Sequence, residues 1–140
     1  MDIRKINDNL SVSPQIAISD LNAVAEAGFR SVISNRPDGE TEDQSTAAEI
    51  KAAAEAAGLT FAHVPVVGGQ ISDADIETFR ETLDALPAPV LGFCRTGTRS
   101  TTLWSLANAK KQPVDQLIAT AGEAGYDLNG LRPRLETLAG

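Results

Sequence analysis

The sequence predicts an α/β fold in which helices flank a central, mostly parallel sheet. Short apolar runs that suit strands alternate along the chain with segments of helical periodicity, and glycine or proline marks many of the boundaries. This alternation is typical of parallel strands joined by helical crossovers. A chain of 140 residues, 42% of them hydrophobic, can bury one core, so we expect a single domain over residues 1–140.

The first half of the chain is expected to supply most of the sheet. Strands are expected at Ile3–Ile6, Leu10–Ser13, Phe29–Ile33 and Leu59–Val64. Between them, one helix is expected to begin at Ser19 or Asp20, which can cap its free N–H groups, and to end at Gly28. Alanine favours helix, so a second helix is expected over Thr46–Ala57, where Gly58 ends it.

The second half is expected to contain one strand and several helices. Ser72 and Asp75 form a short variant of the capping box at the start of a helix. Apolar residues at helical spacing then predict one buried face, made of Ile76, Phe79, Leu83 and Leu86. After it we expect a strand at Pro89–Phe93 and helices at Arg99–Lys110, Pro113–Ala124 and Leu131–Leu138.

Three loops follow expected strands, and a parallel sheet brings such loops together at the carboxyl ends of its strands. They are Ser34–Glu40, Pro65–Gln70 and Cys94–Arg99. The third is the most informative, because a buried strand ends at the only cysteine and a helix begins a few residues later. Backbone N–H groups and the positive end of the helix would then surround the sulfur and favour its nucleophilic thiolate form.

The cysteine loop therefore supplies the candidate catalytic residues. Cys94 is the expected nucleophile, and Arg99 offers a planar fork of donors for an anion. Gly97 lets the backbone curl without a side-chain clash. We expect the remaining anion-binding and substrate-binding groups to be Arg95, Thr96, Gly97, Thr98 and Ser100, with the Ser100 hydroxyl donating to the sulfur or capping the helix.

The other two loops supply candidate supporting residues. Arg36 would reach toward an anionic substrate, and Asn35 or Asp38 would fix the cysteine loop, although Pro37-Asp38-Gly39 also forms a turn whatever it binds. His63 would be structural, buttress the loop or shuttle a proton. The carboxylates that follow, Glu40, Glu42 and Asp43, are expected to form a solvated acidic turn.

Composition excludes several classes of function. The 12 Lys and Arg against 19 Asp and Glu give a net charge of −7, which disfavours nucleic acid and anionic membranes as partners. One histidine excludes metal sites built on several histidines, and we expect neither metal nor cofactor. The chain shows no signal peptide and no long apolar run, so we expect the cytoplasm, where a lone thiol stays reduced.

The residues above resemble two known groups of proteins. The loop Cys94-Arg-Thr-Gly-Thr-Arg99 is similar to the Cys-x4-Arg loop of rhodanese sulfurtransferases. Together with that loop, Ile33-Ser-Asn-Arg-Pro-Asp-Gly-Glu40 and His63-Val-Pro-Val-Val-Gly-Gly-Gln70 resemble the beta-lactamase-hydrolase-like family, a bacterial group with a cysteine-phosphatase fold. The resemblance implies a protein-tyrosine or dual-specificity-phosphatase-like fold that acts as a sulfurtransferase, with a separate persulfide dioxygenase as a possible partner.

The chain departs from true cysteine phosphatases, which carry His-Cys-x5-Arg. Phe93 stands where they have histidine, and Arg99 makes the loop one residue shorter. A smaller ring of N–H groups should suit a persulfide's terminal sulfur better than a tetrahedral phosphate. A phosphatase also needs a general acid. The candidates Asp38, Asp73 and Asp75 lack a recognisable acid-loop setting.

The leading hypothesis is a sulfurtransferase. Cys94 would take sulfane sulfur from thiosulfate or a small persulfide, its anionic donor, and pass the sulfur to a thiol or cyanide. The alternative is a dual-specificity-type phosphatase that uses Cys94 as nucleophile and Arg99 as phosphate ligand. A third possibility is a non-catalytic module whose loop only binds an anion or a partner, and a thiol titration of Cys94 would separate it from the two enzymes.

Overall fold

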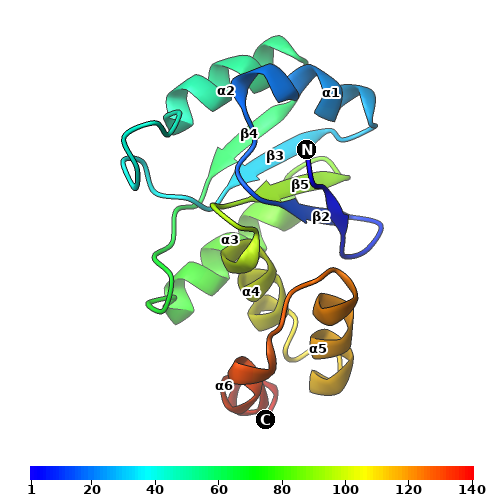
Figure 1. Ribbon diagram of the computed structural model, residues 1–140. Helices are drawn as coiled ribbons and strands as arrows, with labels where there is room; N and C mark the ends of the chain where they lie inside the picture. The colour runs from blue at the N-terminus through cyan, green and yellow to red at the C-terminus, as the bar shows by residue number, and fades with distance from the viewer.

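The computed structural model describes residues 1–140 and contains one five-stranded sheet with helices on both faces (Figure 1). The strands are β1 (Arg4–Lys5), β2 (Leu10–Ser13), β3 (Ser31–Ser34), β4 (Thr60–His63) and β5 (Val90–Phe93). Their order across the sheet is β1-β2-β5-β3-β4. Only the short β1 runs antiparallel to its neighbour, and the other pairs are parallel. The expected α/β fold with a mostly parallel sheet is confirmed.

Helices form two layers. Helices α1 (Leu21–Glu26) and α2 (Ala47–Ala56) cover one face of the sheet, and the remaining four lie on the other side (Figure 1). Those four are α3 (Asp73–Ala85), α4 (Thr98–Ala107), α5 (Val114–Glu123) and α6 (Arg132–Ala139). Two short 3-10 turns, η1 (Ile18–Asp20) and η2 (Asn129–Leu131), precede α1 and α6. None of the helices is both long and apolar enough to cross a bilayer.

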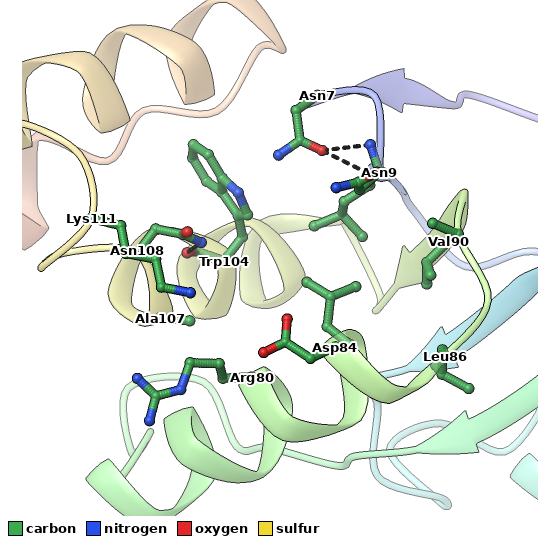
Figure 2. A pocket seen from close by; sticks show the side chains of 13 residues that line it. Asn7, Asn9, Arg80, Asp84, Leu86, Val90, Trp104, Ala107, Asn108 and Lys111 are labelled. Atoms are coloured by element: carbon green, nitrogen blue, oxygen red, sulfur yellow. Dashed lines mark hydrogen bonds between the residues drawn. The ribbon is translucent and has the colours of Figure 1, made fainter.

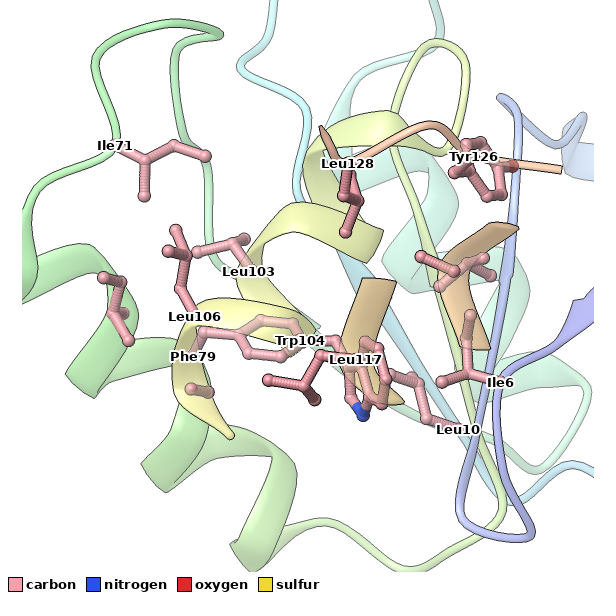
Figure 3. Packing of buried hydrophobic residues seen from close by; sticks show 14 of the residues in the cluster. Ile6, Leu10, Ile71, Phe79, Leu103, Trp104, Leu106, Leu117, Tyr126 and Leu128 are labelled. Carbon is pink, nitrogen blue, oxygen red and sulfur yellow. The ribbon is translucent and has the colours of Figure 1, made fainter. Parts of the chain in front are cut away.

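The pleat of the strands divides the apolar side chains between two cores. Because successive side chains of a strand point to opposite faces, Leu91 and Phe93 pack with the α1 and α2 layer, whereas Val90 packs with α3 to α6. The larger core, on the side of α3 to α6, is centred on aromatic and leucine side chains of these helices (Figure 3). Trp104 lies in this core, as the helical periodicity of α4 predicts.

Local capping fixes where the helices begin. Thr46 accepts the Glu49 N–H at 3.1 Å before α2, and Ser72 accepts the Asp75 N–H at 3.1 Å before α3, which confirms the predicted capping box. The predicted cap of α1 is wrong in detail. The Asp20 carboxylate accepts the Ala17 N–H at 2.8 Å and so closes the preceding η1 turn, and no side chain caps α1 itself.

The sheet order decides where chemistry can occur. Strand β5 lies between β2 and β3, and the loops after β3 and β4 lie beside the one after β5. The Asn35 N–H donates to the Phe93 carbonyl at 2.8 Å, and the Val66 N–H donates to the Asn35 carbonyl at 3.1 Å. These bonds join the three loops that sequence analysis expected to meet.

Candidate active site

Cys94 follows directly on β5 and its side chain is fully buried. The chain then turns through Gly97, whose φ of +93° is strained for any residue with a side chain, and α4 begins at Thr98. The Gly97 N–H points at the Cys94 Sγ, with a nitrogen–sulfur distance of 3.0 Å. The strand–loop–helix geometry predicted around the thiol is therefore present, with one backbone donor on the sulfur.

The outer fork of the Arg99 guanidinium, made of Nη1 and Nη2, is engaged by Glu40 in this structure. Nη1 and Nη2 of Arg99 donate to Oε2 and Oε1 of Glu40, each at 2.8 Å, in a bidentate pair. Nη1 also donates to the Val66 carbonyl at 3.0 Å. The Arg99 side chain is 14% exposed, so the pair lies at the edge of the buried thiol.

Glu40 lies in the exposed acidic turn that sequence analysis expected, but it is tied to the site by ion pairs that were not expected. Its carboxylate also accepts from the Nε of Arg36 at 2.9 Å and is only 28% exposed. The hydrogen bonds from Arg99, with those from Arg36, lower the pKa of Glu40 to about 2. Sequence analysis missed this residue because a carboxylate in a polar loop has no local pattern that distinguishes a site residue from a solvated one.

Arg36 is held by side chains of the protein itself. Its side chain is 5% exposed. Beyond the bond to Glu40, Nη1 donates to the Gln15 Oε1 at 3.0 Å and Nη2 to the Thr41 Oγ at 3.4 Å. Arg36 therefore fixes Glu40 beside Arg99. That Arg36 also reaches an anionic substrate stays a prediction.

Asn35 and Ser100 form a buried polar link between the β3 loop and α4. The Ser100 hydroxyl donates to the Asn35 Oδ1 at 2.8 Å, and the Asn35 Nδ2 donates to the Val64 carbonyl at 2.9 Å. Both residues are fully buried. The expectation that Asn35 fixes the cysteine loop fits these contacts. The expectation that Ser100 donates to the sulfur or caps the helix does not, since its proton goes to Asn35.

Asp38 and His63 lie outside the cysteine loop's contacts. The Asp38 carboxylate accepts the Ala47 N–H at 2.7 Å at the start of α2, so it neither holds the cysteine loop nor faces the thiol. The Nε2 of His63 lies 2.9 Å from the Arg36 carbonyl oxygen and thus supports the β3 loop. The remaining acid candidates are also engaged elsewhere, Asp73 with Arg134 at 3.3 Å and Asp75 in the Ser72 cap.

Tyr126, which sequence analysis missed, buttresses the cysteine loop from the segment after α5. Its hydroxyl donates to the Thr96 carbonyl at 3.1 Å, and a Cβ built on Gly97 would collide with that hydroxyl. Burial raises the pKa of Tyr126. Arg4 lies over the ring, 5.3 Å from its centroid. A lone tyrosine after a helix gives no sequence signal for this contact, which only the tertiary fold creates.

The other predicted binding residues are on the outer side of the loop. Arg95, Thr96 and Thr98 are exposed, and the Thr96 hydroxyl donates to that of Thr98 at 3.0 Å. Arg95 lines an open cavity of about 400 Å³. The other residues around it come from the segment before α1 and from the β3 loop: Gln15, Ile16, Ala17, Arg36, Thr41, Asp43, Gln44 and Ser45. Arg95 is the one residue of the cysteine loop that lines this cavity, and the buried Cys94 does not line it.

A second cavity, of about 310 Å³, lies at the opposite edge of the sheet (Figure 2). Its walls include Leu10 and Val90, which begin β2 and β5, and Trp104 of α4. Because Cys94 follows the other end of β5, this cavity is separated from the thiol by the length of the strand. It contains none of the predicted site residues.

Comparison with known proteins agrees with this geometry. A sequence model of the family described as Beta-lactamase hydrolase-like protein, phosphatase-like domain, matches residues 2–111. The Beta-lactamase hydrolase-like protein of Agrobacterium fabrum is 38% identical over 105 residues, 75% of this chain and 24% of that protein. The one of Xylella fastidiosa (strain Temecula1) is 35% identical over 130 residues, 91% of this chain and 30% of that protein. The chain thus spans less than a third of these curated relatives.

Solved structures give the fold. A protein of Neisseria meningitidis, provisionally named a phosphatase, superposes with a TM-score of 0.90 and 41% identity over 99% of both chains. The core catalytic domain of a PP-IP phosphatase of S. cerevisiae has a TM-score of 0.73 at 13% identity, over 97% of this chain and 84% of that one. The first likeness extends past residue 111 and so includes the Tyr126 segment. The chain has the cysteine-phosphatase fold and belongs to the beta-lactamase hydrolase-like family, in its phosphatase-like domain.

Proposed function

We propose that this phosphatase-fold protein is a sulfurtransferase that carries sulfane sulfur on Cys94. The observation on which the proposal rests is the short loop between Cys94 and Arg99, which directs the Gly97 N–H onto the sulfur at 3.0 Å. A donor at this position stabilises negative charge on the sulfur, and it would do the same for a persulfide formed there. One thiol is enough for such a cycle, and the chain has only one.

The two half-reactions balance without a cofactor. The Cys94 thiolate attacks the outer sulfur of thiosulfate or of a small persulfide, and a new S–S bond forms. The old S–S bond breaks, and sulfite or the thiolate leaves with the bonding pair. In the second half, a thiolate or cyanide attacks the outer sulfur of the Cys94 persulfide, and the Cys94 thiolate leaves. Each leaving group departs without needing a proton.

The carboxylates of the site support sulfur transfer over phosphoester hydrolysis. A phosphatase must protonate an alkoxide leaving group. Glu40 is the carboxylate bonded to Arg99, and with a pKa of about 2 it carries no proton to give near neutral pH. Asp38 is committed to the start of α2. Neither Glu40 nor Asp38 is therefore placed to protonate the leaving group.

Phosphatase activity is the second candidate, and the comparisons by name favour it. The family is described as phosphatase-like, and the 41% identical protein of Neisseria meningitidis is provisionally named a phosphatase. The same residues would serve this reaction, with Cys94 attacking phosphorus and Arg99 binding the phosphate oxygens after release from Glu40.

Two assays on the purified chain separate the candidates. The first measures thiocyanate formation from cyanide with thiosulfate or glutathione persulfide as the donor, and the second measures hydrolysis of p-nitrophenyl phosphate. We expect turnover in the first assay with at least one donor, no turnover in the second, and loss of turnover in Cys94→Ser. Phosphate-ester hydrolysis that disappears in Cys94→Ser, without any thiocyanate formation, would establish the phosphatase instead.

A further inference from the structure

The donor fork of Arg99 is already filled by an anion from the protein itself. Both outer nitrogens of Arg99 donate to the two carboxylate oxygens of Glu40 at 2.8 Å, which is the bidentate geometry that a phosphate or sulfate would otherwise adopt. An oxyanion that uses this Nη1–Nη2 fork must therefore first displace Glu40, and with Glu40 in place only the Nε–H and the second Nη2–H of Arg99 are left for an anion.

The displacement of Glu40 from Arg99 is opposed by a second bond, which Glu40 accepts from Arg36. Arg36 holds the Oε1 of Glu40 at 2.9 Å, and Arg36 is itself fixed by Gln15 at 3.0 Å. Glu40 thus accepts three hydrogen bonds from two guanidinium groups, and it stays ionised at any pH near neutrality because its pKa is about 2. The carboxylate is a permanent part of the site and is not switched by ordinary changes of pH.

The local charge is also nearly balanced. Arg36 and Arg99 contribute two positive charges, Glu40 contributes one negative charge, and a Cys94 thiolate would contribute another. A doubly charged oxyanion would add two negative charges to a site that has no net positive charge left among these four groups. A donor whose reacting sulfur carries little charge does not meet this penalty.

We propose that Glu40 determines the substrate class of this site by denying the Arg99 fork to doubly charged oxyanions, so that alkyl persulfides are preferred over thiosulfate and phosphate. This inference rests on the proposed function of Cys94 as a sulfur acceptor. The preferred step is attack of the Cys94 thiolate on the outer sulfur of a protonated alkyl persulfide. The S–S bond of the donor breaks, the alkyl thiolate leaves with the bonding pair, and the proton stays on the transferred sulfur.

The test compares Glu40→Gln with Glu42→Gln. Both substitutions remove one negative charge from the same loop, but Glu42 is exposed and makes none of the observed bonds to Arg36 or Arg99. Inorganic phosphate is titrated into each ¹⁵N-labelled protein, and the amide signals of Gly97 and Thr98 are followed by NMR. We expect Glu40→Gln to bind phosphate at least about tenfold more tightly than wild type, and Glu42→Gln to match wild type within about twofold.

The same variants are compared for turnover with cyanide as acceptor. We expect the ratio of kcat/KM for glutathione persulfide to that for thiosulfate to fall at least about tenfold in Glu40→Gln and to stay unchanged in Glu42→Gln. The NMR spectrum of each variant reports whether it is folded, and Glu40→Ala serves as the second variant if Glu40→Gln is not.

Two results would overturn the proposal. One is equal phosphate affinity in the Glu40 and Glu42 variants, and the other is an unchanged donor ratio. Failure of the proposed function has a different signature. Wild type would then transfer sulfur from neither donor, while the gain in phosphate affinity of Glu40→Gln would still support the exclusion of oxyanions by Glu40.

Discussion

The two edges of the sheet each have a cavity, but they differ in chemistry. At the carboxyl edge, three loops bring together the buried Cys94 thiol, the Arg99 fork and the buried Asn35. The thiol accepts from the Gly97 N–H, Arg99 donates to Glu40, and Asn35 accepts from Ser100. At the amino edge, a cavity of about 310 Å³ is lined by Trp104 and by polar side chains that include Asp84 and Lys111, without a thiol (Figure 2). The two edges therefore differ in the reactive groups they hold.

The difference follows from the direction of the strands. Parallel strands all end at the same edge, so the loops that follow them are neighbours and can build one site. The starts of the strands are joined to preceding helices, and in this chain the cavity there is bounded by α3 and α4. Four substitutions and one direct measurement test whether the carboxyl edge holds the reactive site.

Gly97→Ala should have the largest effect. Alanine would have to adopt the φ of +93°, and its Cβ would collide with the Tyr126 hydroxyl, so the loop must move away from the sulfur. We expect turnover to fall at least about tenfold and the free energy of unfolding to fall by about 2–3 kcal/mol. Gly122→Ala is the matched control, because nothing lies within 4 Å of its added Cβ and Gly122 has no positive φ. An active, stable Gly97→Ala protein would show that the loop geometry is not critical.

Glu40→Gln should change how stability depends on pH. Glu40 has a pKa of about 2 in the folded protein against 4.5 for the unperturbed group, so its contribution is full above about pH 4.5 and is lost as the pH falls toward about 2. The stability advantage of wild type over Glu40→Gln should therefore shrink by about 1–2 kcal/mol over this range, because solvent screens this partly exposed ion pair. Urea unfolding of both proteins at several pH values measures this difference in the free energy of unfolding. A constant difference between the two proteins would contradict the ion pairs described for Glu40.

Ser100→Ala should destabilise the link between the loops. It leaves the buried Asn35 Oδ1 without its donor, which costs about 1–2 kcal/mol. Ser105→Ala is the control on the same helix, since the buried Ser105 hydroxyl donates at 2.8 Å to the Thr102 carbonyl within α4. We expect the control to lose less than about 1 kcal/mol in urea unfolding. Equal losses of stability in Ser100→Ala and Ser105→Ala would mean that the bond from Ser100 to Asn35 contributes no more than a hydroxyl bond within the helix.

Tyr126→Phe should have the smallest effect of the four. The ring stays in place, and only the hydrogen bond of 3.1 Å to the Thr96 carbonyl is removed. We expect a loss of about 0.5–1 kcal/mol in stability and a modest decrease in kcat. Thermal unfolding and steady-state assays measure the two effects. A drop in kcat as large as that of Gly97→Ala would indicate that the hydroxyl itself takes part in the reaction.

Sequence analysis located the elements well because their signals are local. The capping residues Thr46 and Ser72 and the glycines that end helices each act within a few positions of themselves. The strand–cysteine–helix pattern around Cys94 is local for the same reason, and it predicted correctly that the thiol lies at a strand end before the Gly97 turn. The meeting of the three loops was predicted from the parallel direction of the strands.

The errors concern contacts between distant residues. Glu40 and Arg99 are separated by 59 positions and Tyr126 and Thr96 by 30, and neither pair follows any spacing rule. Arg36 and Ser100 were assigned to the substrate and to the sulfur because their residue types suit those partners. The fold instead gives each a protein partner, Glu40 and Asn35.

Intact mass spectrometry of the chain after incubation with glutathione persulfide, without an acceptor, reports directly whether Cys94 carries sulfane sulfur. We predict one added sulfur atom on wild type, no addition on Cys94→Ser, and removal of the added sulfur by cyanide as thiocyanate. An unmodified wild-type chain, or the same addition to Cys94→Ser, would contradict the role of Cys94 as the carrier of sulfane sulfur.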